Sequence, residues 1–148
     1  MKAAPSAVAL ASAIEQLLHA LAQRRHVLGD EEPSPLSTFQ SIAMTVIDDE
    51  GPMRLYALAE RLRTTKATAS RTIDVLAAHG LAQRQSDPSD GRGVLVSATR
   101  PGHRFVLDRR SRLAALLEQL LAEMELDEAQ RFTELLGELG DLLDRHPA

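Results

Sequence analysis

Residues 55–99 read LYALAERLRTTKATASRTIDVLAAHGLAQRQSDPSDGRGVLVSAT, and this stretch decides the fold. Two short helical patterns come first, joined at Thr64-Thr65, and Gly80 ends the second. Two strand-like runs follow around a polar tip that is rich in glycine. The order helix, turn, helix and hairpin predicts a winged helix-turn-helix within a mainly α (α+β) fold.

The first expected helix covers residues 56–63 and the second covers 66–79. Thr64 or Thr65 is expected to cap the second helix, and Gly80 suits a left-handed residue after its end. Apolar residues recur along one face of each helix, which predicts that the two helices pack together. These residues are Leu58, Ala59 and Leu62 in the first helix, and Ala69, Ile73 and Leu76 in the second.

The polar residues of the second helix gather near its N-terminal end, off the apolar face. In a recognition helix, this end reaches base edges in the major groove. Arg71 suits a guanine and Thr68 suits a thymine methyl or a base edge, whereas Lys66 and Ser70 suit phosphates. Taken alone, the helix fits an ordinary amphipathic helix with a solvated polar face better.

The expected wing consists of strands 81–85 and 94–97 around a tip at 86–93. The tip contains proline and glycine, which favour turns over regular structure. Arg92 suits a minor groove, and Asp90 could hold its guanidinium by a charge-assisted bond. A polar hairpin tip by itself is common and means little. The candidate DNA-binding residues are Thr64, Thr65, Lys66, Thr68, Ser70, Arg71, Arg84, Asp90 and Arg92.

Residues 36–102 resemble the MarR family of transcription regulators. The resemblance is carried by LSTFQSIAMTVIDDEGPMRLYALAERL, TTKATASRTIDVLAAHGLAQR, DPSDGRGVLVSAT and RPG. Its most specific part is the wing, where Asp90-x-Arg92 precedes an apolar strand and Ser97-x-Thr99. The resemblance implies a homodimeric DNA-binding repressor or activator, often released by a small molecule.

The net charge of −4 does not at first suit a protein that binds DNA, but the charge is unevenly distributed. Residues 53–104 carry 9 basic and 4 acidic side chains, whereas 1–52 carry 3 and 7 and 105–148 carry 5 and 10. Residues 53–104, which include the expected helix-turn-helix and wing, therefore carry a net charge of +5. Because local charge decides how a surface meets phosphate, the acidic remainder is expected to face away from DNA.

Length and composition indicate one ordinary globular unit of 148 residues. There are no cysteines, which excludes disulfides, cysteine-based zinc sites and thiol sensing of oxidants. No apolar run is long enough to span a membrane, and no signal peptide is recognisable at the N-terminus. We therefore expect a cytoplasmic protein with no membrane association and no cofactor.

The N-terminal part is expected to contain two helices and a minimal strand. Residues 7–28 form a long apolar-periodic pattern that ends at Gly29. A second helix is expected from Ser37, with Gln40 completing a capping box, to about Asp49. Gly51-Pro52 ends it, and 53–55 is expected to pair with the wing. The residues expected to be buried are Phe39, Ile42, Ala43, Val46 and Ile47.

The C-terminal part is expected to form two leucine-striped helices. Thr99 caps the first, which should run to about Glu125, and Asp127 caps the second. These helices and the N-terminal helix carry more apolar surface than a small core can cover, so we expect a two-fold dimer that reads a palindrome. A completed monomer core is the plainer alternative. The expected interface residues are Leu10, Ile14, Leu17, Leu120, Phe132, Leu136, Leu139 and Leu143.

The predicted organisation is a single domain over 1–148, with a DNA-reading part at 36–99. Segments 7–29 and 100–146 would form the dimerisation part. No serine elbow, phosphate loop or metalloprotease motif occurs, so an enzyme is not expected. The pairs Asp48-Asp49 and Glu31-Glu32 are interpreted as solvated charge.

Two other functions stay open. None of the five histidines has metal-ligand spacing, so no metal residues are assigned. A zinc-responsive regulator would nevertheless be possible if His19, His26 or His103 converged in space. A winged helix can also serve as a protein-interaction module, which would leave the basic residues as generic surface charge. The Asp90-x-Arg92 wing argues against that reading.

The effector is the least determined part of the prediction. The family resemblance implies a pocket between the dimer helices and the reading part. Its apolar walls with one or two polar groups would suit a small aromatic or phenolic acid. The residues expected to line it are His19, His26, Phe39, Ala43 and Met44.

Overall fold

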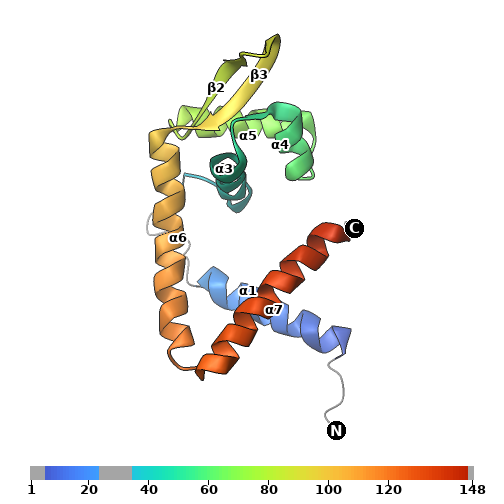
Figure 1. Ribbon diagram of the computed structural model, residues 1–148, viewed down its shortest axis with the longest axis vertical. Helices are drawn as coiled ribbons and strands as arrows, with labels where there is room; N and C mark the ends of the chain where they lie inside the picture. Colours follow the sequence, from blue (N-terminus) through green and yellow to red (C-terminus); the bar gives the residue numbers. More distant parts are fainter. Residues whose placement is uncertain (1–5, 24–34, 147–148) are drawn as a thin grey trace. The chain divides into compact units, whose positions relative to one another are not determined.

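The computed structural model describes residues 6–23 and 35–146. Within these residues the chain forms six helices and one three-stranded sheet, in the order α1, α3, β1, α4, α5, β2, β3, α6 and α7 (Figure 1). The chain divides into two compact units between Arg112 and Leu113. The first unit contains a winged helix-turn-helix, which confirms the predicted mainly helical fold class.

Helix α3 (Thr38–Glu50) begins with the predicted capping box. The Ser37 Oγ accepts the backbone N–H of Gln40 at 3.2 Å, and the Gln40 Oε1 accepts the backbone N–H of Ser37 at 2.8 Å. Two N–H groups that have no partner within the helix are thereby satisfied. The helix ends before Gly51-Pro52, as expected from the break in the sequence pattern.

Helices α4 (Leu55–Arg61) and α5 (Lys66–Ala78) form the helix-turn-helix. Thr65 is the N-cap of α5, and its Oγ1 accepts the Thr68 N–H at 3.1 Å. Gly80 has φ of +69°, in the left-handed region that glycine enters without strain, as predicted. The next strand can therefore leave α5 at a sharp angle.

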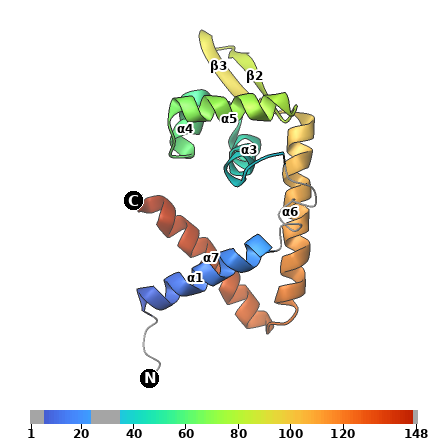
Figure 2. The same ribbon diagram turned by 180° about the vertical axis from the view of Figure 1, so that it is seen from behind.

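The wing is a longer hairpin than predicted. Strands β2 (Ala82–Asp87) and β3 (Asp90–Ala98) pair antiparallel, and β1 (Met53–Arg54) joins the other edge of β3. The sheet order is β1-β3-β2. The segment 86–93 was expected to be an irregular tip, and this was wrong because all but Pro88 and Ser89 is strand. Figure 2 shows the hairpin extending beyond α5.

The core of the first unit lies between α3, α4, α5 and the sheet. The predicted faces of α4 and α5 are buried, with Leu58, Ala69, Ile73 and Leu76 each at 0% exposure. On α3, Ala43 and Ile47 are buried as expected. Phe39 and Ile42 were expected to be buried too, but they are 37% and 46% exposed. Ile42 lies on the side of α3 away from Met44 and Ile47. Phe39 shares the side of Ala43, four residues later, but lies in the first turn of the helix.

Helix α6 (Arg100–Leu121) starts at a close approach to the core. The Thr99 Oγ1 accepts the Gly102 N–H at 3.1 Å and donates to the Gly80 carbonyl at 2.6 Å. A Cβ on Gly102 would clash with the Leu81 carbonyl oxygen and lie 2.9 Å from the Met44 Cε. Glycine is therefore required here for α6 to begin where it does.

Helices α6 and α7 differ from their predicted bounds, and α1 can be compared with its predicted range only in part. Helix α1 covers Ala7–Gln23, and the rest of its predicted range lies outside the described residues. Helix α6 ends at Leu121 instead of Glu125, and α7 (Leu126–Arg145) has Glu125, not Asp127, at its N-cap position. No helix in the described part of the chain is long and apolar enough to cross a membrane.

Candidate nucleic-acid interface

The start of α5 is held by its threonines. Besides capping the helix, Thr65 donates its hydroxyl to the Thr68 Oγ1 at 3.0 Å. Thr72 in turn donates to the Thr68 carbonyl at 2.9 Å. Thr64 donates its backbone N–H to the Ala59 carbonyl at 2.9 Å and is half-buried. Thr64 and Thr65 therefore shape the turn, whereas Thr68 is partly exposed beside it.

Lys66 and Arg71 are the exposed cations of α5. Neither forms an ion pair within residues 6–23 and 35–146. Both side chains are therefore available to a ligand, as predicted from their position off the apolar face. Thr68 lies between them in sequence and is half-buried. A long cation on each side of a short hydroxyl suits a surface that contacts phosphates and bases.

Arg84 does not lie free on the wing. Its Nη2 donates to the Asp74 Oδ1 at 2.7 Å, and it lies 3.1 Å from the Ser70 carbonyl and 3.2 Å from the Ser70 Oγ. Arg84 thus joins β2 to α5, and it also engages the carbonyl and the hydroxyl oxygen of Ser70. Sequence reasoning missed Asp74, although its position four residues after Ser70 places both on one helix face.

A second arginine anchors the end of the wing, and sequence reasoning missed it as well. Arg54 on β1 donates to the Asp87 Oδ2 from Nε at 3.0 Å and from Nη2 at 2.6 Å. The Asp87 Oδ1 accepts the backbone N–H of Ser89 at 2.9 Å and its hydroxyl at 2.7 Å. Asp87 is only 7% exposed. The carboxylate therefore ties the two-residue turn of the hairpin to the base of the sheet.

These bonds favour the ionised form of Asp87. The hydrogen bonds from the Ser89 hydroxyl and backbone N–H have the largest effect on the pKa of Asp87, and they lower it. Burial opposes them, and smaller contributions from Arg54 help to bring the pKa to about 2. The same pair raises the pKa of Arg54. No obvious motif marks the pair, because Arg54 and Asp87 are 33 residues apart.

Asp90 has a different partner from the one predicted. Its Oδ1 accepts the backbone N–H of Arg92 at 3.1 Å, and its Oδ2 lies 3.5 Å from the Arg54 Nη2. The expected bond to the Arg92 guanidinium is not formed, because the carboxylate turns toward Arg54. Arg92 is exposed, and its side chain makes no ion pair in the part of the chain that the structure describes.

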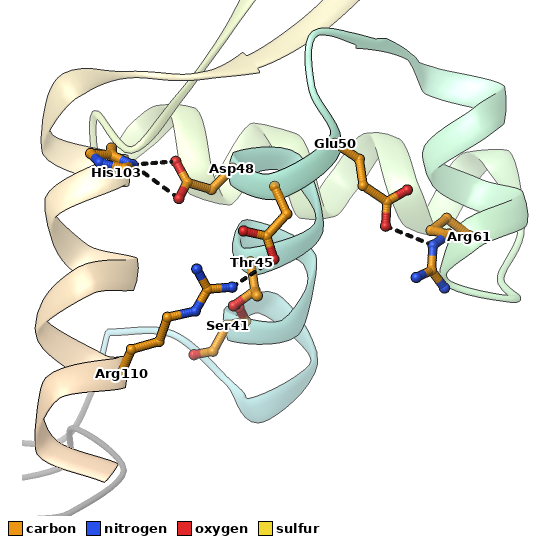
Figure 3. A network of polar contacts seen from close by, with 8 residues as sticks. Ser41, Thr45, Asp48, Glu50, Arg61, His103 and Arg110 are labelled. Carbon is orange, nitrogen blue, oxygen red and sulfur yellow. Dashed lines mark hydrogen bonds and ion pairs between the residues drawn. The ribbon is translucent and has the colours of Figure 1, made fainter. Parts of the chain in front are cut away.

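Three consecutive carboxylates at the end of α3 hold neighbouring helices (Figure 3). The Asp48 carboxylate accepts a hydrogen bond from the His103 Nδ1 at 2.9 Å. The Asp49 carboxylate accepts one from the Arg110 Nη2 at 2.6 Å, and the Glu50 carboxylate accepts one from the Arg61 Nε at 2.8 Å. The interpretation of Asp48-Asp49 as solvated charge was therefore wrong for Asp48, whose side chain is 7% exposed, whereas Asp49 is exposed as expected. Glu31-Glu32 lies outside the described residues. The run fastens α3 to α6 and α4.

The residues predicted to line an effector pocket are not equivalent in the structure. Ala43 and Met44 are fully buried in the closed core, whereas Phe39 is partly exposed on α3. His19 lies on α1 with its Nε2 2.8 Å from the Gln23 Nε2. His26 lies outside the described residues. Among the residues that are described, no group of three or more potential metal ligands occurs.

Comparisons with known proteins agree with this geometry. The model of the MarR family matches residues 40–94. An uncharacterized HTH-type transcriptional regulator of Mycobacterium leprae is 40% identical over 89 residues, which are 60% of this chain and 62% of the relative. The chain thus matches less than two thirds of that relative's length.

Solved structures share the fold over nearly the whole chain. A MarR-like transcriptional regulator from Thermotoga maritima superposes with a TM-score of 0.72 at 27% identity, covering 92% of this chain and 98% of the other. FabT from Streptococcus pneumoniae, solved in complex with DNA, gives a TM-score of 0.71 at 17% identity, covering 90% and 97%. At that identity the FabT structure supports the fold alone.

The relatives are named as transcriptional regulators, which agrees with the expectation from the sequence. The matched segment spans α3, both helices of the helix-turn-helix and most of the wing. It includes the turn at Thr65, the Arg84 fastening and the Arg54–Asp87 pair. Over residues 40–94 in sequence, and over most of the chain in fold, the protein is similar to regulators of the MarR family.

Proposed function

We propose that the protein is a sequence-specific DNA-binding transcription regulator. Helix α5 enters the major groove and the β2–β3 hairpin enters an adjacent minor groove. The observation that carries this proposal concerns α5 and the wing, where Lys66, Arg71 and Arg92 are exposed and form no ion pair with the described residues. They belong to the segment with a net charge of +5 in an otherwise acidic chain.

The three cations have different roles in the proposed complex. Arg71 has the length and the planar donors to bind a guanine by two parallel bonds. Lys66 is the first residue of α5, where the helix dipole also favours an anion, and it contacts the sugar–phosphate backbone of the DNA. Arg92 reaches the narrow groove beside the wing. Thr68 meets a base edge from its place between Lys66 and Arg71.

We further propose that the regulator acts as a homodimer on a palindrome. Support comes from apolar side chains that remain exposed on helices with no buried residue, such as Leu10 and Leu17 on α1 and Phe132 and Leu136 on α7. Leucine and phenylalanine faces of this kind are stabilised when a partner covers them. A two-fold dimer would place its recognition helices about 34 Å apart, one turn of DNA.

Repression, and its release by a small aromatic acid, complete the proposal. Such a ligand would act by preferring a dimer whose recognition helices are wrongly spaced for the operator. Thermal-shift measurements with salicylate-like acids test this part. A ligand that raises the melting temperature and weakens DNA binding supports it, and a series that changes neither rejects this ligand class.

The proposed function is tested by fluorescence anisotropy with DNA from upstream of the gene, against a scrambled control, over a salt series. We expect tighter binding to the upstream DNA and a steep fall with salt, since each phosphate contact releases counterions. Arg104→Gln is the matched control, because Arg104 is an exposed arginine outside the proposed contacts. Binding that ignores both sequence and salt would instead indicate a winged helix that binds protein.

A further inference from the structure

A hollow of about 290 Å³ lies between the wing and the start of α5. Side chains from five elements line it, and four of them are cationic while none is acidic. These residues include Arg54, Tyr56, Lys66, Arg84, Arg92 and Val94. A recess walled by charges of one sign concentrates the electrostatic potential, so its chemistry favours an anion.

Two of the four cations are already committed to carboxylates. Arg54 lies 2.6 Å from Asp87, and Arg84 lies 2.7 Å from Asp74. These pairs offset much of the positive charge, and they hold each guanidinium in one position. Arg54 and Arg84 therefore act as fixed walls of the hollow, with limited capacity to neutralise another anion.

Lys66 and Arg92 are different. Both are exposed, and neither has an ion pair in the described ranges. Lys66 comes from the first residue of α5, whose 13 residues add a positive dipole end, and Arg92 comes from β3. The backbone of Arg92 is held by Asp90 through its N–H. One hollow thus contains one unpaired cation from the helix and one from the wing.

The geometry of DNA indicates which anion this is. A sugar–phosphate strand separates every major groove from the adjacent minor groove. If α5 lies in one groove and the wing lies in the next, that strand must pass between them. We propose that the hollow seats one phosphate of this strand, with Lys66 and Arg92 as its two charged donors. This inference rests on the proposed function.

Sharing one phosphate would couple the two halves of the reading surface. Each non-bridging oxygen can accept from one cation, so the helix and the wing would be set at one register along the same strand. The Arg54–Asp87 and Arg84–Asp74 pairs would keep the two sides of the hollow at a constant separation. Arg92 then contributes through the backbone, in addition to any contact in the minor groove.

The test replaces single phosphates of a footprinted operator by uncharged methylphosphonates, one position at a time. Binding is measured for the wild type, Lys66→Gln, Arg92→Gln and the double variant, with Arg104→Gln as control. In the wild type and the control, the seated phosphate should cost about tenfold in affinity when neutralised. In the double variant the same substitution should cost less than about twofold, while other phosphates keep their effects.

Each other outcome is decisive. If the two single variants lose sensitivity at different phosphates, or the double variant loses it at none, the shared seat is wrong while the regulator function stands. If the wild type does not distinguish the operator from scrambled DNA, the proposed function fails and the seat fails with it. A titration with inorganic phosphate tests whether the hollow binds free phosphate instead of DNA. The backbone amide signals of Lys66 and Arg92 monitor this titration. Saturation there with an unchanged DNA pattern would assign a site for free phosphate and overturn the proposal.

Discussion

The Arg54 guanidinium binds the Asp87 carboxylate through two hydrogen bonds, at 3.0 and 2.6 Å, and so joins the strand before α4 to the end of the wing. Asp87 is 7% exposed and also accepts both donors of Ser89. The hairpin therefore remains strand up to a two-residue turn. A wing fixed at both ends can present Arg92 without a large loss of conformational entropy on binding.

The hydrogen bonds that Ser89 and Arg54 donate to Asp87 predict a specific dependence of stability on pH. The pKa of Asp87 is lowered from 3.8 to about 2 in the folded protein, so the folded state holds this proton more weakly than the unfolded state does. The stabilisation is therefore complete above about pH 4 and is lost as the pH falls toward 2.

In urea unfolding, Asp87→Asn should be less stable than the wild type at pH 7, and the difference should shrink between pH 4 and 2. Asp108→Asn, at an exposed acid on α6, should show no such convergence. A wild-type advantage that persists at pH 2 would contradict the assignment.

Arg71 predicts a loss of sequence choice. If it reads a base, Arg71→Ala should weaken operator binding by about 1–3 kcal/mol and relax the preference at one base pair in each half-site. Anisotropy with a set of single-base operator variants measures both effects. Arg104→Ala removes the same charge from α6 and should leave the preference intact. Unchanged affinity and unchanged preference in Arg71→Ala would remove Arg71 from the reading surface.

The start of α6 predicts a packing defect. In Gly102→Ala, the new methyl group would clash with the Leu81 carbonyl and crowd the Met44 side chain, which should destabilise the fold by about 1–3 kcal/mol. Gly137→Ala is the matched control within α7, because nothing lies within 4 Å of the added Cβ. That change should instead stabilise by up to about 1 kcal/mol. Denaturant unfolding of both variants checks the contrast, and equal effects would argue against the close approach.

The apolar face of α7 predicts the oligomeric state. Leu139→Asp places a charge on that face and should split the proposed dimer, since burying an unpaired carboxylate is costly. Analytical sedimentation measures the change. Gln130→Asp adds the same charge on the opposite face of α7 and should leave the dimer intact. A sedimentation profile of Leu139→Asp identical to that of the wild type would place the interface elsewhere.

Features that depend on neighbouring residues could be predicted from the sequence. The capping box of Ser37 and Gln40, the Thr65 cap and the left-handed Gly80 involve groups only a few residues apart, so their energetics are contained in short segments. The buried faces of α4 and α5 follow from helical periodicity in the same way. The resemblance of residues 36–102 to one family supported the predicted order of the helices and strands.

Features that depend on distant partners could not. The prediction left the wing tip irregular because proline and glycine favour turns, but a carboxylate anchored 33 residues away keeps it extended. The bonds from Arg84 to Asp74 and Ser70 could not be predicted, because no local pattern indicates them. The prediction treated Phe39 as buried because it is apolar and shares the face of Ala43, although whether the first turn of α3 is covered depends on where the neighbouring elements pack.

The sequence by itself determined the winged helix-turn-helix, its caps and the concentration of positive charge in residues 53–104. These follow from local propensity, periodicity and composition, which act along the chain. Only the tertiary structure decided which charges are committed and which remain available. Pairing is a matter of distance in space, and folding brought Arg54 to Asp87, Arg84 to Asp74 and His103 to Asp48 while leaving Lys66 and Arg92 beside one hollow.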